Sequence, residues 1–176
     1  MAVVVRPADR GELTAVGRLT LDAYAADGHI DESGLYAPHL LDAASRADHG
    51  ELLVAVVDGR LAGTVTFCPE GSPFSEVAGP GEGEFRMLAV APAARRLGVA
   101  EALVRACIDR SHELGYRALV LSSMTVQVEA HRLYERLGFR RTSERDWSPR
   151  PGIDLIGFQL DLTAGTGTAP GRLPPG

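Results

Sequence analysis

The sequence predicts an α/β fold with a mixed sheet and a parallel βαβ unit at its centre. A strand, a helix and a second strand follow one another between residues 84 and 122, and a crossover of this length joins parallel strands. Two strand-like runs flank Asp58-Gly59, which is typical of a hairpin turn. The length of 176 residues, with 45% hydrophobic and 23% charged residues, fits one globular domain.

The first elements are a strand and two helical stretches. Residues 2–6 are β-branched and apolar, and Pro7 ends this strand. Asp9 is a typical N-cap, and apolar residues recur at helical spacing from residue 13 to residue 23. A second helix is expected from Asp31 to Ala47, with an interruption at Pro38.

The hairpin that follows pairs residues 51–57 with residues 60–68. From Pro69 to Gly83 the chain is rich in Gly, Pro and Ser without any period, so a surface loop is expected. Glu84 begins the next strand, which ends at Val90 before Pro92.

The second half of the chain is predicted to alternate helices and strands. A helix runs over residues 98–114 with Gly115 as its stop, and a strand buried on both faces covers residues 117–122. A shorter helix spans residues 126–137 and stops at Gly138. Residues 139–144 and 153–162 form a closing antiparallel pair joined by a loop over residues 147–152. The tail, residues 163–176, is expected to be disordered.

Charge and composition exclude several functions. The net charge of −5 argues against nucleic-acid binding, and no apolar run is long enough to span a membrane. The apolar run at the N-terminus is too short for a signal peptide, so a cytoplasmic location is expected. Cys68 and Cys107 lack metal or disulfide spacing, are expected to be buried, and fit a reducing compartment. The scattered histidines predict no metal site, and the absence of lysine excludes a Schiff base.

The segment from Met87 to Ala100 carries the clearest functional signal. A strand runs into a short loop with Arg95 and Gly98 and then into a helix, whose first N–H groups can hold a phosphate. Small residues keep the approach open, and Arg95 or Arg96 adds positive charge. The alternative is a tight loop in which glycine merely lets the helix begin. The glycine-rich run at residues 79–83 precedes a strand, so it is not read as a phosphate loop.

Two motifs in this order resemble those of the GNAT N-acetyltransferase superfamily. Arg95-x-x-Gly98-x-Ala100 is similar to its acyl-CoA motif Q/R-x-x-G-x-G/A, and residues 130–139 (AHRLYERLGF) to its A-x-x-L-Y-x-x-x-G-F signature. The resemblance covers residues 3–162. It implies a mainly antiparallel sheet of six to seven strands around the parallel unit, about four helices, and a single acyl-CoA N-acyltransferase domain over residues 1–162.

The resemblance also implies where acetyl-CoA, the acyl donor, would bind. The pantetheine arm would pair with a strand that splays from its parallel neighbour, at Leu88, Ala89 and Val90. The pyrophosphate would lie on the N–H groups of Arg96, Leu97, Gly98, Val99, Ala100 and Glu101. Gln127 stands where many members have Asn and offers the same amide on a longer arm. No metal is implied.

Three residues are candidates for catalysis. Tyr134 matches the tyrosine that protonates the leaving thiolate in many members, although a packed core tyrosine is the plain alternative. Glu84 matches the general base of the histone acetyltransferase branch, while some members place a Glu where this chain has Ser122. A solvated Glu at a strand start is the alternative for Glu84. His131 shares a helix face with Gln127 and Tyr134 and is a second candidate base, unless it is simply part of the helix surface.

The resemblance implies direct acetyl transfer from acetyl-CoA to an amine in a ternary complex, with backbone N–H near Val90 polarising the thioester carbonyl. The loop before the strand has acidic residues and no basic one, which favours a small cationic amine or a peptide amine as acceptor. Those acidic residues are Glu70, Glu76, Glu82 and Glu84. Two alternatives remain: a non-catalytic acyl-CoA sensor, and a protein-interaction module whose cleft has degenerated. Dimers are common in this family, so a homodimer is one expected assembly.

Overall fold

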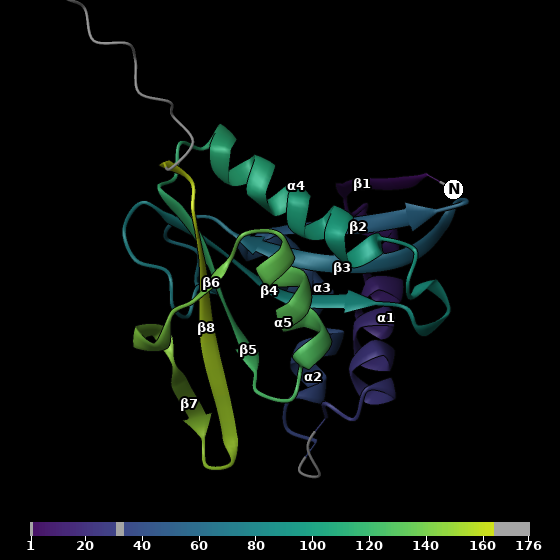
Figure 1. Ribbon diagram of the computed structural model, residues 1–176. Helices are drawn as coiled ribbons and strands as arrows, with labels where there is room; N and C mark the ends of the chain where they lie inside the picture. Colours follow the sequence, from purple (N-terminus) through teal and green to yellow (C-terminus); the bar gives the residue numbers. More distant parts are fainter. Residues whose placement is uncertain (1, 31–33, 164–176) are drawn as a thin grey trace, which may run out of the picture.

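One mixed sheet organises the part of the chain that the structure, a computed structural model, describes: residues 2–30 and 34–163 (Figure 1). Its strands are β1 (Val3–Pro7), β2 (Glu51–Val57), β3 (Arg60–Cys68), β4 (Glu82–Val90), β5 (Ala118–Met124), β6 (Arg140–Arg141), β7 (Trp147–Arg150) and β8 (Ile153–Asp161). Their order is β1-β2-β3-β4-β5-β8-β6, and β7 pairs with β8. Every pair in the described residues is antiparallel except the central pair, β4 and β5.

Helices cover both faces of the sheet. They are α1 (Leu13–Ala26), α2 (Ala37–Leu41), α3 (Ala43–His49), α4 (Val99–Glu113) and α5 (Val128–Arg136). The first three lie on one face, and α4 and α5 lie on the other (Figure 1). Among the described residues, no helix has the length and apolar character needed to cross a bilayer.

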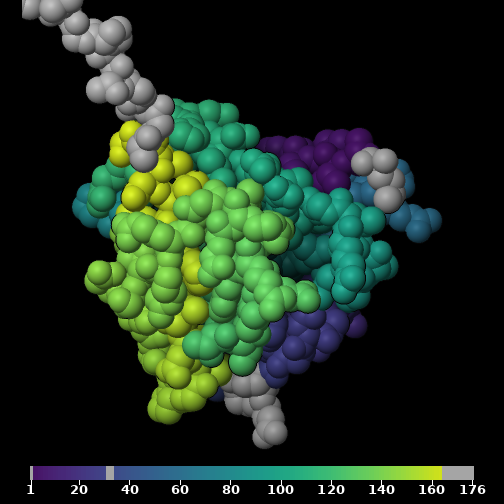
Figure 2. All heavy atoms as spheres, viewed as in Figure 1, coloured from purple at the N-terminus to yellow at the C-terminus, as the bar shows by residue number. Residues whose placement is uncertain are grey.

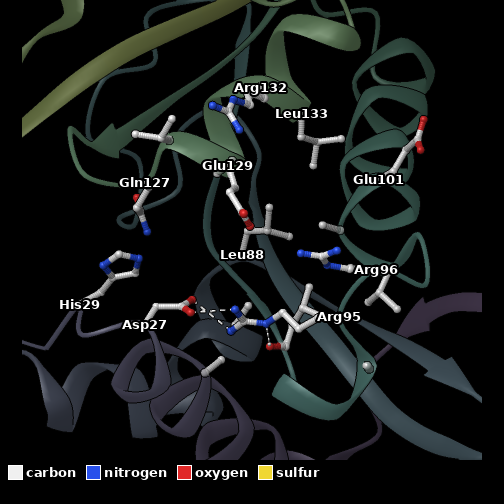
Figure 3. A pocket seen from close by; sticks show the side chains of 18 of the residues that line it. Asp27, His29, Leu88, Arg95, Arg96, Glu101, Gln127, Glu129, Arg132 and Leu133 are labelled. Atoms are coloured by element: carbon white, nitrogen blue, oxygen red, sulfur yellow. Dashed lines mark hydrogen bonds and ion pairs between the residues drawn. The ribbon is translucent and has the colours of Figure 1, made fainter.

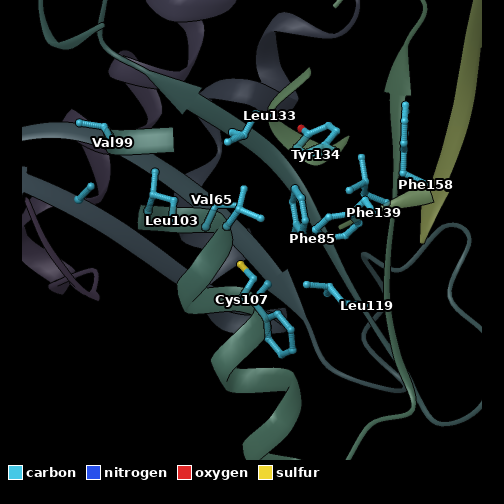
Figure 4. Close-up of a cluster of buried hydrophobic side chains, with 14 of the residues drawn as sticks. Val65, Phe85, Val99, Leu103, Cys107, Leu119, Leu133, Tyr134, Phe139 and Phe158 are labelled. Atoms are coloured by element: carbon cyan, nitrogen blue, oxygen red, sulfur yellow. The ribbon is translucent and has the colours of Figure 1, made fainter. Parts of the chain in front are cut away.

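The alternation of side chains along β2 explains why the sheet has two cores. Leu52 and Val54 pack against α1 and α3, whereas Ala55 and Val57 belong to the larger cluster under α4 and α5. This is the period of two expected of a strand buried on both faces. Aromatic rings fill the larger cluster, where Phe85 of β4 lies close to residues from α5 (Figure 4).

The two parallel strands separate soon after they meet. β4 pairs with β5 only over residues 82–84, opposite residues 118–120. Beyond that point β4 follows β3, and β5 follows β8. The pairing of β4 with β3 shifts register between Thr64 and Thr66, and Met87 has φ +54°, which is rare for a residue with a side chain. Beyond residue 84, the described part of β4 is thus no longer paired with β5.

The predicted fold class is confirmed, with two corrections at the level of elements. The expected helix from Asp31 to Ala47 is replaced by two shorter helices, α2 and α3. Residues 31–33 of the expected helix lie outside the described residues. The break falls at Asp42, whose side chain accepts a hydrogen bond from the N–H of Ser45 and so starts α3. Pro38 does not interrupt a helix, because it lies in the first turn of α2, where no N–H is needed.

The second correction concerns the closing strands. Residues 147–150 form β7, a hairpin with β8, rather than a loop. The strand expected over residues 139–144 shrinks to β6, because residues 143–145 form a 3-10 turn. Asp146 stabilises that turn by accepting hydrogen bonds from Arg141 and from the N–H of Gly157. The described sheet therefore has eight strands instead of six to seven. The expected disordered tail lies, beyond Thr163, outside the described residues, and the single domain over residues 1–162 stays a prediction.

Candidate functional site

Two adjoining pockets open where β4 and β5 separate. The larger pocket, of about 790 Å³, lies between the start of α4, α5 and the end of α1. Figure 2 shows its mouth as a hollow between the green surface of α5 and the teal segment that precedes α4. The smaller pocket, of about 370 Å³, is lined by residues near α2 and by the β7–β8 hairpin. Tyr24, His29 and Gln127 line both, so the pockets share a wall.

The larger pocket contains an open helix N-terminus. Residues 92–94 form a 3-10 turn, Arg96 has φ +63°, and Gly98 has φ +79° as the N-cap of α4. Glycine suits that position because it adopts the left-handed region without a steric penalty. No side chain caps the start of α4. Its first N–H groups, with the partial positive charge of the helix end, therefore remain available to an anion.

Arginines surround this helix end. Figure 3 shows Arg96 directed into the pocket, and Arg132 and Arg136 of α5 line it as well. Arg95 instead forms a bidentate ion pair with Asp27 at 2.7 and 3.0 Å, and its Nε donates to the carbonyl of Val90. A site with this much positive charge is suited to phosphate groups. The sequence analysis missed Arg132 and Arg136, although their i, i+4 spacing on a predicted helix is a usable signal.

Most residues predicted to bind the cofactor line this larger pocket. They are Leu88, Ala89, Val90, Arg95, Arg96, Gly98, Val99, Ala100, Glu101 and Gln127. Leu97 does not line it and is 37% exposed, and Tyr134 lies outside its lining. The strand, the loop and the helix start thus meet in one place, as their order in the sequence implied.

Gln127 stands at the wall between the two pockets. Its side-chain oxygen accepts hydrogen bonds from Ser123 Oγ (2.7 Å) and from the N–H of Met124 (2.9 Å). These bonds fix the turn between β5 and α5. The side-chain NH₂ group, which no described residue engages, is left as a donor toward a ligand in either pocket.

Tyr134 belongs to the aromatic cluster beneath α5. Its ring centroid lies 5.8 Å from that of Phe85, 5.9 Å from Phe139 and 5.6 Å from Phe158. Burial raises the pKa of the phenol, so it stays protonated at neutral pH. Figure 4 shows its oxygen pointing away from Phe139 and Phe158. The ring is therefore a core residue, and its hydroxyl remains a proton donor.

Glu84 is placed where a general base is not expected. It is fully buried and lines neither pocket. Its carboxylate accepts hydrogen bonds from the N–H groups of Glu76, Val77 and Ala78 at 2.8–3.1 Å. Burial raises the pKa of this carboxyl, against the effect of these N–H groups. The sequence analysis placed Glu84 at a strand start, but β4 begins two residues earlier, so Glu84 lies inside the paired region and anchors the preceding loop.

His131 lines neither pocket, but it contacts two residues that line the smaller one. Its Nε2 lies 3.1 Å from Ser123 Oγ and 3.1 Å from the carbonyl oxygen of Met124, and its ring packs on Phe158. Burial lowers the pKa of the imidazole. The helix face that borders the larger pocket instead carries Glu129, Arg132 and Arg136. The geometry thus favours a structural role for His131 at the end of β5.

Three of the four acidic residues in and beside the loop before β4 are engaged by other groups of the protein. Glu82 is buried and pairs with Arg145 at 2.6 Å and Arg117 at 3.1 Å. Glu84 holds the loop backbone as described, and Glu70 is exposed outside both pockets. Glu76 alone of these four lines the smaller pocket, where its Oε1 lies 2.6 Å from Nε of Arg86. The sequence analysis missed Arg86, whose partners come from distant parts of the chain.

The described residues offer neither a reactive thiol nor a metal site. Cys68 and Cys107 are buried free thiols, as expected, and burial raises the pKa of Cys68 to about 12. Within residues 2–30 and 34–163, no cluster of His, Cys, Asp and Glu has the arrangement of a metal site.

A family model described as the acetyltransferase (GNAT) family matches residues 16–139. The chain belongs to the GNAT acetyltransferase family. Curated relatives include an uncharacterised N-acetyltransferase of Schizosaccharomyces pombe, 35% identical over 112 residues, which cover 64% of this chain and 65% of that protein. Human N-acetylaspartate synthetase is 33% identical over 102 residues, 58% of this chain and 32% of that protein. The matched segments span 65% or less of the length of these curated relatives.

Solved GNAT structures share the fold. The ribosomal-protein-S18-alanine N-acetyltransferase of Escherichia coli superimposes with a TM-score of 0.68 at 19% identity, covering 96% of this chain and 99% of that one. An acetyltransferase of Salmonella typhimurium, solved with its cofactor acetyl-CoA, has a TM-score of 0.66 at 21% identity. That match covers 98% of this chain and 100% of the other. At such identities the likeness establishes the GNAT fold.

Proposed function

We propose that this GNAT protein transfers an acetyl group from acetyl-CoA directly to an amine. The observation that carries the proposal is the uncapped start of α4, which opens beside the gap between β4 and β5. One end of this site is suited to a pyrophosphate, and the other leads to a second pocket that could hold an acceptor. A related fold solved with acetyl-CoA supports the choice of donor.

The donor would lie along the larger pocket. The backbone of residues 88–90, unpaired with β5, would bind the amide-rich pantetheine arm, and the N–H groups of residues 96–101 would bind the pyrophosphate. Arg96, Arg132 and Arg136 would add positive charge around the phosphates. The thioester would then reach the wall shared with the smaller pocket.

The reaction needs a proton removed from the amine and a proton given to the thiolate. The neutral amine attacks the thioester carbonyl, which backbone N–H near Val90 polarises, and the carbon–sulfur bond breaks. We assign proton removal to Glu76, directly or through a water, because Glu76 lines the smaller pocket, whereas Glu84 is fully buried and lines neither pocket. We assign protonation of the departing sulfur to the phenol of Tyr134 on the resemblance to the GNAT tyrosine, although this buried side chain lies behind the lining of both pockets and must be reached from them.

Thermal unfolding with and without acetyl-CoA tests the donor site, with ATP as a control nucleotide. Saturating acetyl-CoA at about 100 times its Kd adds roughly 2.7 kcal/mol of stability, or about 5–10 °C in Tm for a chain of this size. An amine screen by thiol release then tests turnover. If acetyl-CoA binds but no amine is acetylated, the result would favour a non-catalytic acyl-CoA sensor over an enzyme. No shift at millimolar acetyl-CoA would refute the donor site itself.

The substitution Tyr134→Phe is expected to lower kcat roughly 100-fold, because the general acid is lost. KM and Tm should change little, because the ring contacts with Phe85, Phe139 and Phe158 remain. Steady-state kinetics measure the effect, with Tyr116→Phe, outside both pockets, as the control. Unchanged turnover would show that Tyr134 is only a core residue.

The pH dependence of kcat/KM is expected to show an acid limb set by Glu76. Burial raises the pKa of this carboxyl, while Arg86 opposes the shift. Since the base must be deprotonated, activity is full above this raised pKa and falls as the pH drops through it. Glu76→Gln should remove the limb and lower kcat/KM roughly 100-fold, whereas the exposed Glu144→Gln should keep both. An acid limb at the same pH in Glu76→Gln would exclude Glu76 as the base, because the acceptor amine itself titrates only at a higher pH.

A further inference from the structure

We propose that the acceptor carries a carboxylate beside its amine, as a free amino acid does, and that Arg86 binds this carboxylate in the smaller pocket. The inference rests on the proposed function, because it names the substrate class for the same site. It reverses the expectation of a cationic acceptor, which depended on the acidic residues of the loop before β4.

The charged residues that line the smaller pocket do not favour a cationic acceptor, in contrast to the expectation from the sequence. Of the four acidic residues in and beside that loop, only Glu76 lines this pocket, and Arg86 neutralises it at 2.6 Å. A second guanidinium, that of Arg150, also lines the pocket. Within the described lining, the one carboxylate of the loop is thus paired with Arg86, and it does not give the pocket a net negative charge that would favour a cation.

Arg86 has donors to spare toward such a group. Its side chain is 16% exposed and forms three contacts with described residues: Nε with Glu76, Nη1 with the carbonyl oxygen of Phe74, and Nη2 with the hydroxyl of Tyr36. A guanidinium carries five N–H bonds, so one on each terminal nitrogen lacks a partner among the described residues. Two N–H donors on neighbouring nitrogens are the pattern that binds a carboxylate in bidentate fashion.

Glu76 lies where the amine of the same molecule would be. Its Oε1 contacts Arg86, and its Oε2 accepts no hydrogen bond from the described residues. In an α-amino acid one carbon separates the ammonium from the carboxylate, so the two charged groups lie close together. Glu76 and Arg86 are also adjacent, since they contact each other directly. An amino acid would therefore complement the charged pair, with its ammonium at Glu76, the assigned base, and its carboxylate at Arg86.

The size and walls of the pocket limit the rest of the acceptor. Its volume of about 370 Å³ suits a small molecule, and Met87, Met124 and Leu155 provide apolar surface. These features favour an amino acid with an apolar side chain over a polyamine. The terminus of a peptide fits less well, because an amide replaces the carboxylate beside its amine and cannot accept the charge-assisted pair from Arg86.

The test compares amines that differ only in the carboxylate. L-Leucine is paired with 3-methylbutylamine and with L-leucinamide, L-methionine with 3-(methylthio)propylamine, and spermidine represents cationic acceptors. With acetyl-CoA, thiol release should give a kcat/KM roughly 10- to 100-fold higher for each amino acid than for its decarboxylated partner. Equal or higher values for the decarboxylated amines, leucinamide or spermidine would overturn the proposal.

Variants of Arg86 identify the group responsible. Arg86→Met should abolish the preference, and Arg86→Lys should keep part of it, because a lysine retains the charge without the bidentate geometry. Arg18→Met removes an exposed arginine of α1 outside both pockets and should leave the preference intact. Unfolding curves verify that each variant is folded. A preference that survives in folded Arg86→Met would overturn the assignment, and Arg86→Lys provides the same reading if Arg86→Met does not fold.

A binding experiment separates failure of this inference from failure of the proposed function. Calorimetry with N-acetyl-L-leucine and N-acetyl-3-methylbutylamine, in the presence and absence of CoA, needs no turnover. Tighter binding of the acid, lost in Arg86→Met, supports the carboxylate site even if no acetyl transfer occurs. Equal binding of the two compounds rejects it, even if thermal unfolding with acetyl-CoA demonstrates the donor site.

Discussion

Gly17→Ala is expected to destabilise the protein, because α1 and α2 approach each other through this glycine. A Cβ at residue 17 would overlap the carbonyl oxygen of Leu41 and lie 2.9 Å from its carbonyl carbon. These are backbone atoms, so the helices must move apart, at a cost of about 3 kcal/mol. Alanine returns about 1 kcal/mol of helix propensity. The net loss of about 2 kcal/mol corresponds to a decrease in Tm of roughly 4–8 °C.

Gly11→Ala is the matched control for this prediction. No heavy atom lies within 4 Å of a Cβ built at residue 11, so its Tm should stay within about 2 °C. Because Tyr24 of α1 lines both pockets and His39 of α2 lines the smaller one, Gly17→Ala should weaken the binding of both donor and acceptor. A Gly17→Ala protein as stable as the Gly11→Ala control would show that the two helices are not held at this distance.

Ala100→Glu is expected to weaken acetyl-CoA binding roughly 100-fold, because it places a negative charge where the pyrophosphate would lie. Ala100 is in the first turn of α4 and lines the larger pocket. A glutamate in this turn is favourable to the helix itself, since it complements the partial positive charge of the N-terminus. The loss should therefore appear in the Kd for acetyl-CoA, measured by calorimetry, without a decrease in Tm.

The control for charge alone is Ala93→Glu. Ala93 is exposed in the turn before α4 and does not line the pocket, so the same charge is added nearby without blocking the helix end. The Kd of Ala93→Glu for acetyl-CoA should change less than about threefold, since an exposed charge is screened by water and salt. Equal losses in both variants would point to a general electrostatic effect instead of a pyrophosphate site at residue 100.

The residues around the start of α4 could be predicted from the sequence because their arrangement is local. A strand, two arginines, a glycine and a helix follow within about fifteen residues, and the backbone of that segment suffices to form an anion site. The structural role of Glu84 could not be predicted from the local sequence. It depends on the loop at residues 76–78 folding back over β4, a contact that neither residue type nor spacing specifies.

The closing strands illustrate the same limit. The sequence of residues 147–152, with Trp and two prolines, is typical of a loop, and local propensity misses β7. Tertiary contacts override it, since the β7–β8 hairpin pairs Trp147 with Leu155 and Arg150 with Ile153. The smaller pocket could not be predicted for a related reason, because Tyr36, Glu76 and Arg86, which line it, come from three separate segments.

Glu84 sets the path of the loop before β4 through main-chain contacts alone. The carboxylate binds three main-chain N–H groups, at residues 76, 77 and 78, and ignores their side chains. Any residue other than proline supplies that N–H, so these positions tolerate replacement while the path of the loop is kept. Position 76 lines the smaller pocket, where we propose that the acceptor binds. A buried strand residue thus separates the shape of the loop from the side chains that the loop carries, and Glu76→Gln should remove the assigned base without moving the loop.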